Sequence, residues 1–301
     1  MGAIDLNKEK NIGILIMAHG GGTTWNNMVK QAAEPLNDQF PVEYAWGMAN
    51  FVSLQKAVKA LEEKNVESII VIPLFISKHS PIFRQAEFLL GLRNELADQP
   101  MPVMHNKDEF AEMAGIELND SHFMHNMIFP PTLNQIDINT PVQFTNTLDD
   151  HPIVADILRR RILKLSKDPA RETVVLAAHG PNGEEDNTGW VKNMESLAAQ
   201  VQKMQKENNC NLFRNILALT VRDDATEEIH EQAKQHLRAT VRQGNISGEV
   251  IVIPVFLSSG GREKSVAKRL EGLDFKWSGE TLLPDENLTT FLVDSVKQAL
   301  V

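Results

Sequence analysis

Two stretches decide the fold, Gly13-Ile-Leu-Ile-Met-Ala-His19-Gly20 and Val174-Val-Leu-Ala-Ala-His179-Gly180. Each is a short apolar run that ends in histidine and glycine. A helical pattern with a tryptophan follows each run, Trp25 in one case and Trp190 in the other. Continuous apolar runs of this length are typical of parallel strands that are buried on both faces of a sheet. The sequence therefore predicts that one structural unit occurs twice.

Two further pairs of stretches support a duplication. Ser68-Ile-Ile-Val-Ile-Pro73-Leu-Phe-Ile-Ser77 matches Glu249-Val-Ile-Val-Ile-Pro254-Val-Phe-Leu-Ser258 almost residue for residue. Asp150-His-Pro-Ile-Val-Ala-Asp-Ile-Leu158 precedes one terminal helix, and Asp285-Glu-Asn-Leu-Thr-Thr-Phe-Leu292 precedes the other. Landmarks that recur in the same order indicate an internal repeat.

Within each copy, apolar runs alternate with amphipathic helices, which predicts an α/β fold with a mostly parallel sheet and helices on both faces. We expect an N-terminal domain at 1–168 and a C-terminal domain at 169–301, joined near Pro169, which ends the preceding helix. The first copy carries an insertion at about 101–140 that the second lacks, a candidate lid or binding loop. The expected strands are 12–18, 43–48, 68–77, 142–146, 173–179, 215–221, 249–258 and 279–283.

Composition excludes several classes of protein. The formal charge is −10 and the Lys and Arg residues are scattered, which argues against a nucleic-acid partner. We also expect no membrane span, because no apolar run is long enough. The single cysteine, Cys210, excludes a thiolate-rich metal site, so imidazole or carboxylate would have to bind a metal. The expected compartment is the cytoplasm, or the periplasm if an export signal has been removed.

Three histidines follow predicted strands. Ligands of open parallel sheets bind beyond the carboxyl ends of the strands, where His19 and His179 lie, and His79 follows Ser77 by two residues. Imidazole nitrogen suits Co²⁺, Fe²⁺ or Ni²⁺, so His19 and His79 are candidate metal ligands, and either can accept a proton. Glu87, two helical turns beyond His79, is a candidate for proton or water transfer.

Two loops at predicted helix starts have the composition of anion sites. Exposed backbone N–H groups at a helix start, with hydroxyl and basic side chains nearby, bind carboxylates or phosphates. A polycarboxylate substrate would fit such loops. The candidate substrate-binding residues are Gly20, Gly21, Gly22, Thr23, Lys78, Ser80, Arg84, His179, Ser259, Gly260 and Arg262.

The Ala-His-Gly that ends at Gly20, the Ile-Pro-Leu-Phe strand and the histidine shortly after it resemble the class II chelatases of the CbiX family, in its long two-repeat form. The resemblance covers nearly all of the chain except 101–140. It implies flavodoxin-like three-layer units and a lyase that inserts Co²⁺, Fe²⁺ or Ni²⁺ into sirohydrochlorin or a related tetrapyrrole, as in siroheme or cobalamin biosynthesis. It implies neither ATP nor an organic cofactor. By position, His19 and His79 match the two histidines of the family.

The second copy departs from this pattern, because Pro254-Val-Phe-Leu-Ser-Ser-Gly-Gly-Arg262 contains no histidine. We therefore expect one complete site, in the first half, and a partly degenerate second half, in a monomer or homodimer. The alternatives are a non-catalytic tetrapyrrole or metal carrier and, less favoured, a two-lobed receptor or a serine hydrolase. In the insertion, we interpret the methionines as packing residues and His105, His122 and His125 as too irregularly spaced for a closed metal site.

Overall fold

The computed structural model describes residues 11–96, 107–115, 117, 123–124, 127–128 and 133–301. Contacts divide the chain into two compact units. Unit 1 comprises Met1–Phe75, Ser80–Thr147 and Thr290–Val301, and unit 2 comprises Ile76–His79 and Leu148–Thr289. Each unit contains one four-stranded sheet, and both sheets are entirely parallel.

The sheet of unit 1 has the strand order β2-β1-β3-β6. Its strands are β1 (Ile12–Ala18), β2 (Val42–Trp46), β3 (Ser68–Leu74) and β6 (Val142–Phe144). All seven residues of β1 are buried, as the continuous apolar run predicts for a central strand. On its β6 side, β3 pairs only through Ile69 to Val71, so Pro73 lies beyond the end of β6. The N–H group that proline lacks therefore removes no hydrogen bond between these two strands.

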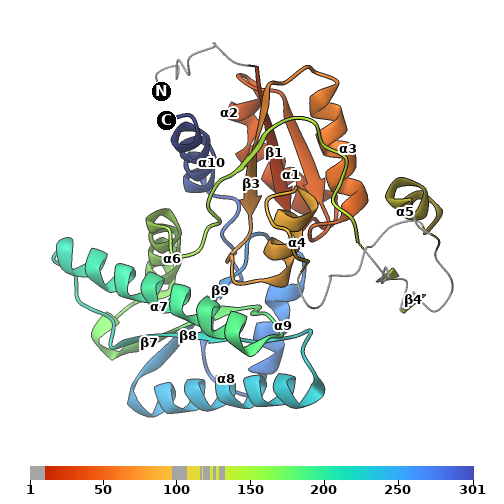
Figure 1. Cartoon of the computed structure of the whole chain (residues 1–301). Coiled ribbons are helices and arrows are strands. Elements are labelled where there is room, and N and C mark those ends of the chain that lie inside the picture. The colour runs from red at the N-terminus through yellow and green to blue at the C-terminus, as the bar shows by residue number, and fades with distance from the viewer. Residues whose placement is uncertain (1–10, 97–106, 116, 118–122, 125–126, 129–132) are drawn as a thin grey trace. The chain divides into compact units, whose positions relative to one another are not determined.

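Helices cover both faces of this sheet (Figure 1). They are α1 (Thr23–Ala32), α2 (Glu34–Asn37), α3 (Phe51–Glu62) and α4 (Pro81–Leu89), while α5 (Lys107–Ala114) packs on α3. Leu15 and Met17 of β1 belong to the core that α3, α4 and α5 cover. Side chains alternate along a strand, so Ile14 and Ile16 point to the opposite face. Right-handed crossovers place α1 on that opposite face, because it leads to β2 on the other side of β1.

Unit 2 repeats this arrangement, with the strand order β8-β7-β9-β10. Its strands are β7 (Glu172–Ala178), β8 (Asn215–Thr220), β9 (Glu249–Val255) and β10 (Lys276–Trp277), and its connecting helices are α7 (Glu184–Glu207), α8 (Glu227–Ser247) and α9 (Arg262–Arg269). α8 and α9 bury Leu237, Val241 and Val266 against one face of the sheet. Strand order and connection order are therefore the same in both halves, which confirms the predicted α/β class.

The terminal helix of each half belongs, wholly or for the most part, to the compact unit of the other half. α6 (Pro152–Leu165) follows β6 in the chain, but it packs in unit 2 against α7 and β9. α10 (Glu286–Ala299) follows β10, and its residues from Thr290 onward belong to unit 1. The join expected near Pro169, in a short 3-10 helix at Pro169–Arg171, thus lies inside unit 2. The domain division at 168 stays a proposal about the repeat.

Seven of the eight expected strands agree with the structure to within a few residues, but the eighth is wrong. A strand was expected at 279–283, whereas β10 is Lys276–Trp277. The chain turns at Gly279, whose φ is +71°. After the turn, the N–H groups of Leu282 and Leu283 donate to Phe256 and Leu257, so the segment returns to the end of β9 without forming a continuous strand.

The described parts of the insertion include α5, the antiparallel pair β4 (Phe123–Met124) and β5 (Met127–Ile128), and the segment 133–140, which forms no helix or strand. α5 is anchored to α3 by Phe110, which is fully buried and meets Phe51 edge to face at 5.6 Å. Met113 packs against the same core, as expected for a methionine that fills an apolar gap. His105, His122 and His125 lie outside the described residues.

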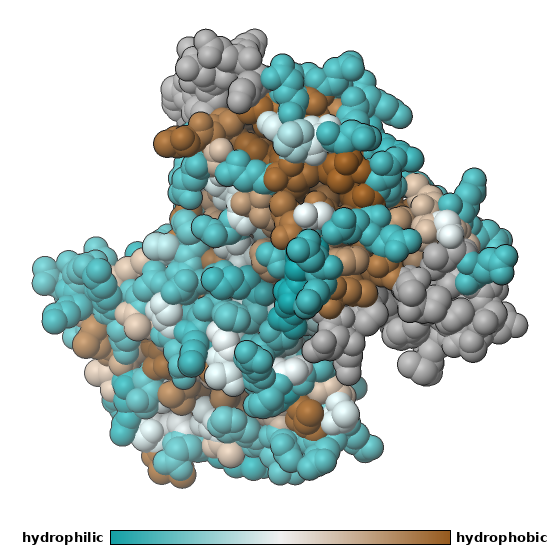
Figure 2. All heavy atoms as spheres, viewed as in Figure 1, coloured by the Kyte–Doolittle hydropathy of each residue, from teal (hydrophilic) through white to brown (hydrophobic). Residues whose placement is uncertain are grey.

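The surface around α7 and α8 is largely hydrophilic, with isolated hydrophobic residues (Figure 2). Ile246, 78% exposed at the end of α8, is one such isolated residue. Among the described helices, none combines the length and the apolar character that a membrane span requires.

Glu172, at the start of β7, allows a test of how burial sets the strength of an ion pair. Its carboxylate is fully buried and accepts hydrogen bonds from Ser166, the Lys167 N–H and Lys276. Burial alone raises the pKa of Glu172, but hydrogen bonds from Lys276, Ser166 and the main chain outweigh it and lower the pKa below the ordinary 4.5. Lys276 also pairs with Glu249, whose side chain is 59% exposed, so the chain supplies a matched control.

We expect Glu172→Ala to lower the free energy of unfolding at pH 7 by about 2–3 kcal/mol, because buried donors lose their partner. Glu249→Ala should cost less than about 0.5 kcal/mol, since an exposed pair is screened by solvent. Because the pKa of Glu172 is lower in the folded protein than in the unfolded chain, its ionised carboxylate stabilises the fold above pH 4.5. This stabilisation is lost as the pH falls through the folded-state pKa. The effect of Glu172→Ala should therefore shrink in acid. Urea unfolding at several pH values measures this, and equal losses for the two variants would contradict it.

Candidate metal and substrate site at the strand ends

His19 stands at the carboxyl end of β1 with an exposed side chain. The next residue, Gly20, has φ +75°, a conformation that favours glycine, and it turns the chain out of the sheet. This turn brings the Gly20 carbonyl to 2.8 Å from Nδ1 of the His19 ring. A carbonyl can only accept, so Nδ1 donates in this contact, and in the neutral ring Nε2 then carries the lone pair. Nε2 is therefore the atom through which His19 can bind a metal.

Aromatic rings lie beside His19. The rings of His19 and Trp25 are 6.5 Å apart, and Trp25 meets Trp46 edge to face at 6.3 Å. Trp46 in turn stacks on Tyr44, two residues before it on the same face of β2, at 5.3 Å. Trp25 is buried, as expected for a core anchor, whereas Trp46 and Tyr44 are half-buried. Burial raises the pKa of Tyr44, against a hydrogen bond from Asn37, so its hydroxyl stays protonated near neutral pH.

The glycine loop after His19 begins α1. Gly22 is the N-cap, and no side chain caps the helix there. The Gly21 N–H donates to Oδ1 of Asn26 at 2.9 Å, so this backbone donor is already used. Gly22 and Thr23 are exposed. Within the predicted anion loop, the Gly21 N–H is therefore not available to bind a substrate anion.

His79 lies in the segment Ile76–His79, which belongs to unit 2. Asn193 of α7 donates to Ser77 Oγ at 3.2 Å and to Asp149 Oδ1 at 2.7 Å, and the His79 N–H donates to Ser77 Oγ. The His79 ring packs on the backbone of Gly189, where a Cβ atom would lie 2.4 Å from Nδ1. A side chain at position 189 would occupy the space of the ring, so this glycine makes room for the half-buried His79.

The basic and hydroxyl residues around His79 have mixed surroundings. Lys78 is exposed, and its N–H donates to Asp149 Oδ1 at 3.0 Å. Ser80 is buried and caps α4 by accepting from the Ile82 N–H, so its hydroxyl has a structural role. Arg84 and Glu87 both lie on α4, in unit 1.

Glu87 has the electrostatics of a proton acceptor. Burial raises the pKa of its carboxyl, and the opposing charges of Arg93 and Arg84 only partly offset this. A carboxyl group with a raised pKa holds a proton more readily than an ordinary glutamate does, which suits acid–base chemistry.

His179 repeats the backbone geometry of His19 with a different outcome at Nε2. Its Nδ1 lies 2.8 Å from the Gly180 carbonyl, and Gly180 has φ +72°. Nε2, however, lies 3.2 Å from Asp224 Oδ2 and 3.4 Å from Arg262 Nη1. Arg262 also pairs with Asp224 at 2.8 Å. Nε2 of His179 is therefore held by the Asp224–Arg262 ion pair, whereas the side chain of His19 is exposed.

The second predicted anion loop is also partly occupied. The N–H groups of Gly260 and Gly261 donate to Oε2 of Glu263 at 3.1 and 2.8 Å. Glu263 is buried, so a carboxylate of the chain itself fills the position that we expected a substrate carboxylate to take. Ser259 is exposed, and Arg262 is held by Asp224.

Sequence reasoning missed Asp224 and Asn193, which position His179 and the His79 segment. Asp224 follows β8, so the rule that drew attention to histidines at strand ends would also have found this carboxylate. Asn193 gave no comparable signal, because it lies within a long helix. In the described part of the chain, no three histidine, cysteine, aspartate or glutamate side chains gather as a metal site.

Taken together, the chain has two four-stranded parallel sheets of the same strand order, each with a histidine after its first strand. At the level of sequence, no family model and no curated protein matches the chain. Similarity to solved structures, in contrast, spans almost its full length.

SirB from Bacillus subtilis, solved with Fe³⁺, has a TM-score of 0.58 at 11% identity over 97% of this chain and 96% of SirB. CbiX, described as the terminal enzyme of siroheme biosynthesis in denitrifying bacteria, has a TM-score of 0.54 at 13% identity over 97% and 100%. DR2241 from Deinococcus radiodurans, described as similar to chelatases with additional domains, has a TM-score of 0.50 at 14% identity over 94% and 54%. These likenesses confirm the chelatase fold that the sequence motifs predict.

The contact of His79 with Gly189 makes a specific prediction. Gly189→Ala favours the helix by roughly 1 kcal/mol in intrinsic propensity, yet its Cβ must displace the His79 ring. We expect shifted ¹H–¹³C NMR signals of the His79 imidazole. Gly183→Ala at the start of α7 is the control, because the nearest atom to its Cβ lies at an ordinary 3.7 Å. An unmoved His79 signal in Gly189→Ala would contradict the contact.

The ion pair at His179 makes another prediction. Hydrogen bonds from His179 and then Arg262, together with their charges, hold the pKa of Asp224 well below its ordinary value of 3.8, against the opposing effect of burial. His179→Ala and Arg262→Ala should each raise the pKa of Asp224 toward 3.8, because each removes a partner of the ionised form. A ¹³C NMR titration of the carboxyl group measures both. A wild-type Asp224 that already titrates near 3.8 would refute this ion pair.

Proposed function

We propose that this protein is a metallochelatase that inserts a divalent cation into sirohydrochlorin or a related tetrapyrrole without ATP. The metal ion is a substrate of the reaction: it enters the macrocycle, and two pyrrole protons leave. The chelatase fold supports the class of reaction, and His19 supports the site.

The observation that carries the proposal is the orientation of His19. Its Nδ1 faces the Gly20 carbonyl at 2.8 Å, which fixes the ring and directs the Nε2 lone pair outward from an exposed side chain. Metal-binding histidines commonly have their second nitrogen held by a carbonyl in this way. An imidazole whose ring orientation is held at a strand end is suited to bind an ion and release it.

We propose His79 as the second ligand, supported by its position after β3 and by the space that Gly189 leaves for its ring. A chelatase needs a weak, open metal site because the ion must be given up to the macrocycle, whereas a carrier would benefit from a closed site with more ligands.

We propose that Glu87 accepts a pyrrole proton or moves water, supported by its raised pKa. Arg84, Lys78 and the Gly22-Thr23 loop would attract the substrate carboxylates. Ser80 and Gly21 contribute less to this proposal, because their hydrogen-bonding groups already have partners within the chain.

We assign catalysis to the first half, as the product of a duplication in which the second half has diverged. The Asp224–Arg262 pair at Nε2 of His179 supports this assignment. The second half would then contribute only substrate contacts and no catalytic residue, through His179, Ser259, Gly260 and Arg262. Structures of SirB contain Fe³⁺ in one case and cobalt in another. We propose Co²⁺ as the metal, with Fe²⁺ and Ni²⁺ as alternatives that imidazole also accepts.

The test is a chelation assay with sirohydrochlorin and Co²⁺, Fe²⁺ or Ni²⁺, followed by the change in tetrapyrrole absorbance. We expect His19→Ala to lower the enzymatic rate by about 100-fold or more, since it removes both a ligand and a proton acceptor. Glu87→Gln should lower the rate less and should alter its pH profile. His236→Ala, an exposed histidine on α8, is the matched control and should retain wild-type activity.

Two outcomes would refute the proposal. One is a wild-type rate no faster than the spontaneous reaction for all three metals. The other is tight stoichiometric binding of tetrapyrrole without turnover, unchanged in His19→Ala, which would identify a carrier.

A further inference from the structure

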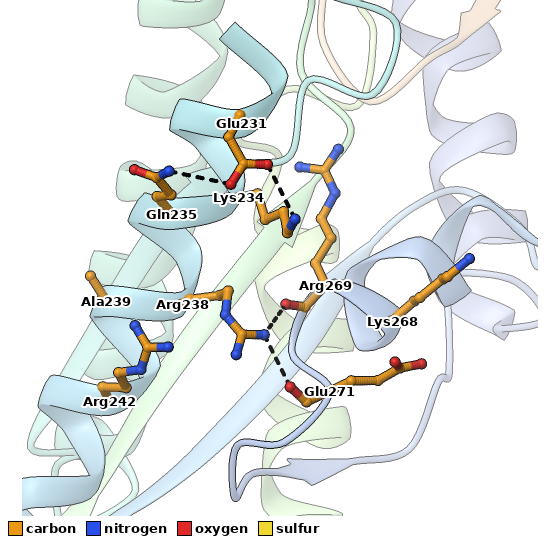
Figure 3. A pocket seen from close by; sticks show the side chains of 9 residues that line it. All are labelled: Glu231, Lys234, Gln235, Arg238, Ala239, Arg242, Lys268, Arg269 and Glu271. Atoms are coloured by element: carbon orange, nitrogen blue, oxygen red, sulfur yellow. Dashed lines mark hydrogen bonds and ion pairs between the residues drawn. The ribbon is translucent and has the colours of Figure 1, made fainter. Parts of the chain in front are cut away.

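A basic groove lies between α8 and α9 of unit 2 (Figure 3). It has a volume of about 720 Å³, and five cationic and two acidic side chains line it. The whole chain carries a formal charge of −10, so this groove has the opposite charge to the protein as a whole. It is separate from the residues that we propose for chelation.

Two of the five cations already have partners. Arg269 is buried, and its guanidinium contacts Asp223, the Val221 carbonyl and the His230 ring. Lys234 pairs with Glu231 at 3.1 Å within α8. These charges are largely satisfied inside the protein and contribute less to binding.

Arg238 is held in place without being neutralised. Its Nη1 donates to the main-chain oxygens of Arg269 and Glu271, at 2.6 and 3.1 Å, across the groove from α8 to the end of α9 (Figure 3). Both acceptors are uncharged carbonyls, so the positive charge remains. A guanidinium fixed in this way loses little freedom when it binds an anion.

Arg242 and Lys268 add charge without internal compensation. Arg242 follows Arg238 by one helical turn on the same face of α8, and Lys268 comes from α9. Both side chains are exposed, and within the described residues no carboxylate pairs with either. Like charges four residues apart destabilise a helix, so repulsion between Arg238 and Arg242 destabilises α8. An anion bound between the two side chains would reduce this repulsion.

We propose that this groove, which we call the α8–α9 groove, binds a small polyanion with at least two phosphate or carboxylate groups. Arg238 and Arg242 bind one group through N–H groups at the edges of their guanidinium planes, and Lys268 binds another. The volume of the groove lies within the range of small-molecule sites. Phosphate and carboxylate share the geometry that guanidinium recognises, and the experiment distinguishes between them.

The test is isothermal titration calorimetry of the full chain, without metal or tetrapyrrole, against tripolyphosphate in one arm and tricarballylate in the other. We expect one binding event for at least one probe, with a dissociation constant below about 1 mM that rises with added salt. The probe that binds more tightly identifies the anion class, phosphate or carboxylate.

The informative variant is the double substitution Arg242→Gln with Lys268→Gln, because neither side chain holds the fold together. It should weaken binding by about tenfold or more, the effect of losing charge-assisted hydrogen bonds. The control, Lys192→Gln with Lys206→Gln on α7, removes the same charge from exposed positions outside the groove. Circular dichroism checks that both variants are folded.

Binding of neither probe up to about 10 mM would overturn the proposal. Equal weakening in the groove variant and in the control would also overturn it, because the attraction would then come from net charge alone. Neither result depends on whether the protein is a chelatase, since the assay contains no substrate of that reaction.

Discussion

The structure depends on a constraint at the ends of β1 and β7. Each strand is buried along its whole length, so the chain must leave the sheet abruptly, and it does so through a glycine with positive φ. The turn offers the glycine carbonyl to Nδ1 of the preceding histidine in both halves. A Cβ atom at Gly180 would lie 2.4 Å from Thr220, so the turn has no room for another residue. The buried strand therefore leads to the glycine turn, and this turn sets the orientation of the imidazole.

The surroundings of the histidine differ between the two halves, because different residues lie beside it. At His19, aromatic rings of α1 and β2 lie beside an exposed Nε2. At His179, a carboxylate from the β8–α8 loop and a guanidinium from the start of α9 hold the same atom. The repeated motif thus has an exposed histidine in one half and a histidine held by an ion pair in the other, because the loops that follow the strands differ between the halves.

The strands were predictable because burial on both faces leaves a continuous apolar run in the sequence, as in Val250 to Val255. The last strand was placed wrongly because Leu282 and Leu283 are apolar and buried for another reason: this segment returns to the end of β9 after the turn at Gly279. The hydrophobic pattern of the sequence also did not reveal that α6 belongs to unit 2 and most of α10 to unit 1. An amphipathic helix shows that it needs a partner surface, but its periodicity does not say which sheet provides it.

The sequence by itself determined the fold class, the recurrence of the unit and the strand ends at which chemistry is expected. These features follow from local patterns: apolar runs, glycine turns and the histidines beside them. Only the tertiary structure decided which side chains meet. It brought Asp224 and Arg262 to His179, Gly189 to His79, and Arg238 to the end of α9. Such contacts join residues that are distant in the chain, and their strength depends on burial and geometry, which no local pattern records.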